Sequence, residues 1–184
     1  GRDAKATLSL QEWCTEKALG PPKNLGQETR SFNYPLGVSA TDEFLMAVAE
    51  ITGQPIPEQL ELERGRLVDA MADSQHWLHG TRMAVYGDPD FTYAMTRFLL
   101  ELGVEPVHVL CTNASRKWEK RMRALLDSSQ FGQATQLWPK KDLWHLRSLL
   151  ATEPAEFVIG NPHGKFLQQD LGLPLIRLTF PIFD

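Results

Sequence analysis

The alternation of apolar and polar positions is most regular beyond residue 80, where short apolar runs are separated by stretches of helical period. The apolar runs predict strands at 83–86, 107–111, 135–138, 157–160 and 175–178. The stretches between them predict helices at 91–102, 116–126, 142–150 and 165–170. Strands joined by helices form right-handed crossovers, so the sequence predicts an α/β fold with a Rossmann-like parallel sheet and helices on both faces. Apart from 135–138, the predicted strands are expected to be parallel neighbours, buried on both faces.

Residues 39–80 have the apolar spacing of helices rather than strands. Ser39 and Asp42 have the spacing of a capping box, and Gly53 is placed to end the helix that follows. A longer helix is predicted over 58–78, with Gly80 near its end. Its apolar face would carry Leu60, Leu67, Met71 and Leu78.

Residues 1–38 are the least regular part of the chain, and Gly20-Pro21-Pro22 interrupts any period there. They predict a short helix over 8–17, a loop, and an extended segment at 32–35. The predicted organisation is therefore an irregular N-terminal segment at 1–38, a helical segment at 39–80 and a truncated Rossmann-like domain at 81–184.

Composition and charge exclude several classes of function. The formal net charge is -4 and basic residues form no run, so neither nucleic acid nor a membrane surface is expected as a partner. No apolar stretch approaches the ~18 residues of a membrane span, and no apolar signal region is present at the start. These features predict a cytoplasmic protein. The two cysteines, Cys14 and Cys111, are too far apart for a zinc motif and are expected to be small buried residues.

Ligands of Rossmann-like sheets gather at the carboxyl ends of the strands, which here are residues 87–90, 111–113 and 160–165. None of these segments has the G-x-G-x-x-G fingerprint or a Walker loop, so a nucleotide site would lack its phosphate cradle. Asp88 and Asp90 flank Pro89 and are expected to bond nearby backbone and to cap the next helix.

The five histidines show no spacing typical of a zinc site. His76 and His79 share a helix face, but no third ligand follows them. His108 lies within an apolar strand and is expected to be a satisfied core or interface residue. His163 lies in a glycine-flanked loop with Asn161, where helix capping or a subunit contact is expected ahead of catalysis.

Asp69 and Asp73 lie four residues apart on the predicted helix 58–78, which places both carboxylates on one face. Like charges at this spacing destabilise a helix by roughly 0.2–0.5 kcal/mol, unless a cation or Arg66 neutralises them. Two interpretations stay open. The pair is either a solvated acidic face or half of a site for a hard cation, which favours carboxylate oxygens.

Several segments occur in an order that matches a known family. They are TDEFLM at 41–46, GQPIP at 53–57, ERGRLVD at 63–69, WLHG at 77–80, GDPDF at 87–91, FLLELG at 98–103, EPVH at 105–108, KDLWHLRSL at 141–149 and FPIFD at 180–184. Together they resemble the β subunits of nitrogenase molybdenum-iron proteins, from residue 34 to the last residue. A related scaffold family, which helps to assemble the iron-molybdenum cofactor, shares the fold and an ending like FPIFD.

The resemblance implies ATP-coupled reduction of dinitrogen to ammonia. Electrons pass from an iron protein through a P-cluster to the iron-molybdenum cofactor. The implied partners are an α subunit, a second β subunit in an α2β2 heterotetramer and, transiently, the iron protein. In the family, the P-cluster ligands of this subunit lie in an N-terminal half that these residues do not include, and the α subunit holds the iron-molybdenum cofactor. No catalytic or cofactor-binding residue is therefore expected here, and the chain alone should be inactive.

The family also binds a cation between two β subunits through paired aspartates in a Val-Asp-x-x-x-Asp context. Carried over residue by residue, this assigns Asp69 and Asp73 to an inter-subunit cation site that partner ligands complete. The leading function is thus a structural part of the β subunit of molybdenum-iron nitrogenase. The alternatives are a scaffold for iron-molybdenum cofactor assembly and, from the fold alone, a free-standing binder of a small ligand.

Overall fold

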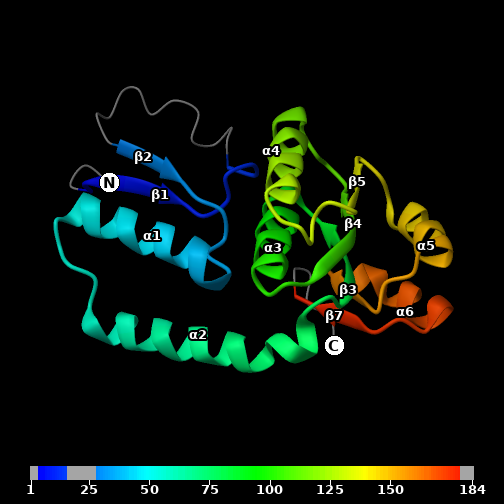
Figure 1. The fold of residues 1–184 in the computed structure, drawn as a ribbon. Helices are drawn as coiled ribbons and strands as arrows, with labels where there is room; N and C mark the ends of the chain where they lie inside the picture. The colour runs from blue at the N-terminus through cyan, green and yellow to red at the C-terminus, as the bar shows by residue number, and fades with distance from the viewer. Residues whose placement is uncertain (1–3, 16–27, 179–184) are drawn as a thin grey trace. The chain divides into compact units, whose positions relative to one another are not determined.

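The chain divides into two compact units, residues 1–74 and residues 75–184. The computed structural model describes residues 4–15 and 28–178. Figure 1 draws the first unit in blue and cyan and the second from green to red.

The first unit contains a pair of short parallel strands, β1 (Ala6–Ser9) and β2 (Glu28–Ser31). The helix predicted over 8–17 is wrong for its described part, because β1 is followed by a turn at residues 12–14, while residues 16 and 17 lie outside the described residues. The extended segment predicted at 32–35 directly follows β2, a strand that the local pattern does not predict. The two strands stabilise each other by non-local pairing, which the apolar periodicity of either segment does not indicate.

Helix α1 (Gly37–Thr52) begins two residues before the predicted capping box. That box is wrong, because the N-cap is Leu36 and makes no side-chain hydrogen bond. The Thr41 hydroxyl instead donates back to the carbonyl oxygen of Gly37 at 2.6 Å. The predicted end is confirmed. Gly53 has a φ of 68° and its N–H donates to the Ala49 carbonyl, a left-handed C-cap that suits glycine.

Helix α2 (Glu58–Leu78) has the bounds that the sequence predicts. None of its residues, all of which the structure describes, is buried. Of the predicted apolar face, Leu60, Met71 and Leu78 are partly buried, whereas Leu67 is exposed. Because most helices in proteins are stabilised mainly by an apolar face, α2 depends on other contacts.

In the described part of the second unit, five strands form one wholly parallel sheet in the order β5-β4-β3-β6-β7. The strands are β3 (Arg82–Gly87), β4 (Glu105–Cys111), β5 (Gln136–Pro139), β6 (Phe157–Gly160) and β7 (Leu175–Arg177). The helices are α3 (Pro89–Glu101), α4 (Arg116–Asp127), α5 (Leu143–Thr152) and α6 (Lys165–Leu171), with the 3-10 turn η1 (Pro162–Gly164) before α6. Figure 1 shows α3 and α4 on one side of the sheet and α5 and α6 on the other. The predicted Rossmann-like α/β fold is confirmed.

The prediction of strands buried on both faces holds for β3, β4 and β6 but is wrong for β7. Ile176 and Arg177 of β7 are exposed. Within the described residues β7 pairs only with β6, so it is an edge strand and lacks the second neighbour that would cover it.

The core of the second unit lies against both faces of its sheet. On the side of α5 and α6, Tyr86, Leu110, Leu146 and Leu167 belong to one buried cluster. Trp118 of α4 is wholly buried, and its indole N–H donates to the Pro89 carbonyl at 2.9 Å. This bond ties α4 to the first turn of α3.

Among the described helices, none combines the length and apolar character that crossing a membrane requires.

Candidate functional site

Asp69 and Asp73 are both exposed on α2. Four residues along an α-helix correspond to a rise of about 6 Å, so the two carboxylates lie one turn apart on the same face. Within the described residues, neither carboxylate forms an ion pair, and Arg66 does not neutralise them. Two carboxylates offer at most four oxygens, whereas Ca²⁺ takes six to eight, so any cation here needs further ligands.

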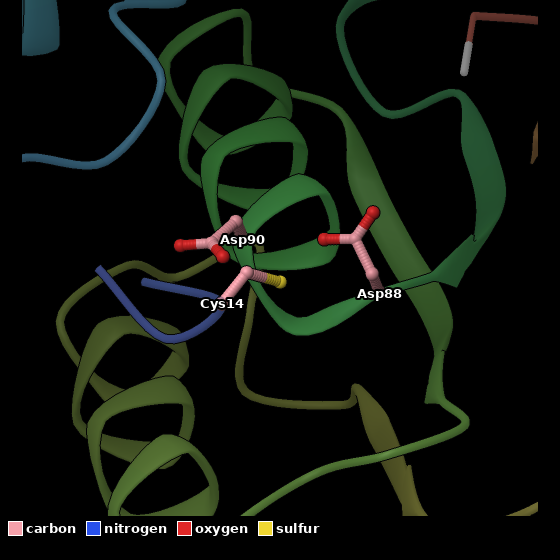
Figure 2. Close-up of side chains that lie close together, drawn as sticks. All are labelled: Cys14, Asp88 and Asp90. Atoms are coloured by element: carbon pink, nitrogen blue, oxygen red, sulfur yellow. The ribbon is translucent and has the colours of Figure 1, made fainter. Parts of the chain in front are cut away.

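Asp88 and Asp90 lie at the carboxyl end of β3, at the start of α3 (Figure 2). Asp88 is the N-cap, and its Oδ1 accepts from the Phe91 N–H at 2.9 Å, as the sequence predicts. Asp90 is wholly buried within the first turn rather than at the cap. An acidic residue in that position interacts favourably with the positive end of the helix dipole. Both aspartates therefore stabilise the helix start.

Helices α4 and α5 are capped in the same way as α3. Ser115 accepts from the Trp118 N–H at 3.1 Å, and Asp142 accepts from the His145 N–H at 2.9 Å. Asn161 accepts from the His163 N–H at 3.1 Å, so the capping predicted for this loop is found on the 3-10 turn η1, whereas α6, whose N-cap is Gly164, begins without a side-chain cap. Phosphate groups bind helix N-termini through free backbone N–H groups. Here side chains already occupy one N–H at each of these starts, which weakens the case for a phosphate cradle.

Tyr86 fills the position where such sheets usually bind a ligand. The strand order reverses between β3 and β6, and Tyr86 lies at the carboxyl end of β3. Its hydroxyl donates to the Asn161 carbonyl and accepts from the Gly164 N–H at 3.1 Å. Burial raises the pKa of this hydroxyl to about 12. Sequence reasoning missed Tyr86, and its only signal was the pair of glycines, Gly160 and Gly164, that leave room for the ring.

His108 is a satisfied core histidine, as the sequence predicts. It is wholly buried, and the Trp138 indole N–H donates to its Nδ1 at 3.3 Å. Because an indole can only donate, Nδ1 is the acceptor and the proton resides on Nε2. Nε2 then donates to the Glu153 carbonyl at 2.9 Å. Both ring nitrogens are used, so this residue serves packing.

His76 and His79 make separate aromatic contacts at the end of α2. The His76 ring centroid lies 4.6 Å from that of Trp77. The His79 ring meets Phe131 edge to face at 5.0 Å. Each side chain therefore packs against an aromatic ring.

The two cysteines differ in their surroundings. Cys111 is buried as predicted, whereas Cys14 is exposed, so the prediction of burial is wrong for Cys14. Cys14 lies in the turn after β1, in a segment predicted as a helix. Burial raises the pKa of the Cys111 thiol to about 12.

Alkylation should therefore separate the two thiols. At pH 8 a thiol with a pKa of about 12 is ionised in only about one molecule in ten thousand, and the thiolate is the reactive form. We expect iodoacetamide to modify Cys14 in the native protein and Cys111 only after denaturation, as measured by mass spectrometry of peptides. A Cys14→Ser variant is the control and should take up no label when native. Rapid native labelling of Cys111 would contradict its burial.

The whole chain matches proteins of one family. The model of the family described as nitrogenase component 1 type oxidoreductase matches residues 2–184. The nitrogenase molybdenum-iron protein beta chain of Bradyrhizobium diazoefficiens is 59% identical over 98% of this chain and 35% of its own length. The protein of that name in Sinorhizobium fredii is also 59% identical, over 99% of this chain and 36% of its own. The solved structure called Nitrogenase Cp1 at pH 6.5 matches with a TM-score of 0.91 at 34% identity, covering 100% of this chain and 40% of that one. The chain thus spans about a third of the length of its curated relatives.

Proposed function

The chain belongs to the nitrogenase component 1 type oxidoreductase family, and from this premise we propose that it is part of the β subunit of a molybdenum-iron nitrogenase. The observation that carries the proposal is 59% identity to a β chain across 98% of these residues. The complete complex would reduce dinitrogen to ammonia with ATP-coupled electrons from an iron protein. Its need for ATP favours the cytoplasm.

The residues present do not fit either cluster of such a complex. Iron-sulfur clusters are held mainly by several cysteine thiolates, and this chain has two cysteines. One of them, Cys111, is buried with its thiol held protonated, which leaves a single exposed thiol. The P-cluster and the iron-molybdenum cofactor are therefore assigned to the rest of the complex. This portion contributes a folded scaffold and a surface for partners.

The proposed partners are an α subunit, a second β subunit and, transiently, the iron protein. Asp69 and Asp73 are proposed to supply half of a cation site between two β subunits. Their exposure on a helix without buried residues supports this role, because ligands from a partner can approach them freely. The alternative of an assembly scaffold is not favoured, since the relatives compared are named as beta chains.

Metal content tests the proposal. The full-length protein that contains this chain should co-purify with an α subunit and carry iron on cysteines outside residues 1–184. Residues 1–184 purified alone should be colourless, because they lack a set of cluster thiolates. Elemental analysis and visible absorption measure the iron content of the full-length protein and of residues 1–184 alone. Several iron atoms bound to the isolated residues, or a full-length protein that never associates with an α subunit, would contradict the proposal.

A further inference from the structure

A bidentate ion pair joins the helices α1 and α2. The Arg64 Nε donates to both Asp42 carboxylate oxygens, at 2.9 Å and 3.0 Å, and its Nη2 donates to Oδ2 at 2.9 Å. Such geometry fixes the guanidinium and carboxylate planes relative to each other, which a single bond does not. The two residues are 22 positions apart, so the pair sets the placement of one helix on the other.

The remaining contact between α1 and α2 is sparse. A groove of about 310 Å³ lies beside the ion pair, lined by residues that include Val38, Leu45, Leu60 and Leu67. A second groove of about 360 Å³ shares Leu45 and Leu60 with the first. With no buried residue on α2, apolar packing does little to fix the rotation of this helix.

The ion pair and the two carboxylates lie on different sides of α2. Each residue turns an α-helix by about 100°, so Asp69 lies roughly 140° and Asp73 roughly 180° around the axis from Arg64. Arg64 faces α1, and the carboxylates therefore face away from it. Any rotation of α2 on α1 changes the direction in which Asp69 and Asp73 point.

We propose that Arg64 and Asp42 are positioning residues, whose ion pair fixes α2 on α1 and thereby aims Asp69 and Asp73 at their cation. The inference rests on the cation site proposed above. For the cation affinity of a variant without the Arg64 charge, the positioning role and simple electrostatics predict changes of opposite sign. Removing the positive charge of Arg64 would strengthen cation binding if charge alone mattered, because a nearby like charge is lost. If Arg64 positions α2, removing its ion pair with Asp42 weakens cation binding instead.

Cation affinity in the full-length assembled protein separates these effects. Mn²⁺ binding is followed by electron paramagnetic resonance, with Ca²⁺ as competitor. We expect Arg64→Gln and Asp42→Asn each to lower the affinity on the order of ten-fold, the scale seen when a residue that orients metal ligands is removed. Arg66→Gln is the matched control, because it removes the same charge from an arginine that makes no ion pair among the described residues. It should leave the affinity unchanged or raise it. The exchanged pair Asp42→Arg with Arg64→Asp should recover part of the loss.

A second measurement reports the helix placement without a cation. Nitroxide labels at the exposed positions 46 and 70, in a Cys14→Ser background, give the distribution of distances between α1 and α2. We expect Arg64→Gln to broaden this distribution and Arg66→Gln to leave it unchanged. An unchanged distribution in Arg64→Gln, or an affinity equal to that of Arg66→Gln, overturns the positioning role. If the wild-type protein binds no Mn²⁺, the proposed cation site fails, while the label distances still decide whether the ion pair places α2.

Discussion

A Gly160→Ala variant is expected to lose about 3 kcal/mol of stability in the second unit, at the upper end of the usual cost of overpacking a core. A Cβ at this position would overlap Cε1 and Cζ of the Tyr86 ring and come within 2.7 Å of its Cδ1. The ring has little freedom to move aside, since it is 1% exposed and its hydroxyl is bonded to Asn161 and Gly164. Relief therefore requires a shift of β3 against β6, two neighbouring strands of the sheet.

Urea unfolding followed by circular dichroism, together with hydrogen exchange of the β6 amides, measures this loss. Gly65→Ala is the control, because a Cβ there meets nothing within 4 Å. Since Gly65 lies inside a helix, that change should stabilise by about 0.5–1 kcal/mol. In a Tyr86→Leu background the cost of Gly160→Ala should shrink, because the ring that it strikes is gone. Equal stability of Gly160→Ala and wild type would show that Tyr86 does not fill this space.

The second unit was predictable because its signals are local. Each strand from β3 to β7 is a short apolar run, each helix has its own period, and their alternation restricts the topology to parallel crossovers. The first unit was less predictable because its strands are held by pairing between segments distant in sequence. The false capping box has a similar explanation. Gly37, with a φ of 78°, allows the chain to enter α1 earlier than the side chains suggest.

In the candidate site, too, the features set by local sequence were predictable, and the contacts between distant segments were not. The spacing of Asp69 and Asp73 on one helix face follows from local periodicity, and the structure exposes both side chains. The contact between Arg64 and Asp42 depends on the rotation of two helices, which no single segment encodes. Tyr86 likewise meets a glycine 78 positions away. Contacts between separate helices and strands could be identified only from the structure.

Replacing Asp69 and Asp73 together by asparagine is expected to weaken association of the β subunits in the assembled protein by about a hundred-fold. A cation present at a hundred times its Kd stabilises the state that binds it by about 2.7 kcal/mol, which corresponds to that factor. In the isolated chain the effect should have the opposite sign. There the two carboxylates repel each other on an exposed helix, so their neutralisation should stabilise α2 by roughly 0.2–0.5 kcal/mol. The opposite signs distinguish a ligand role from a general loss of folding.

Sedimentation of the Asp69→Asn, Asp73→Asn variant beside wild type, each with and without a chelator, measures the association. Wild type treated with chelator should behave like the variant, and chelator should not weaken the variant further, because both treatments remove the same cation. Glu58→Gln with Glu61→Gln is the matched control, since it removes two exposed carboxylates from the first turn of the same helix. That control should associate like wild type and keep its response to chelator. If all proteins associate equally in every condition, Asp69 and Asp73 form a solvated acidic face, because two carboxylates without partner oxygens hold a hard cation only weakly.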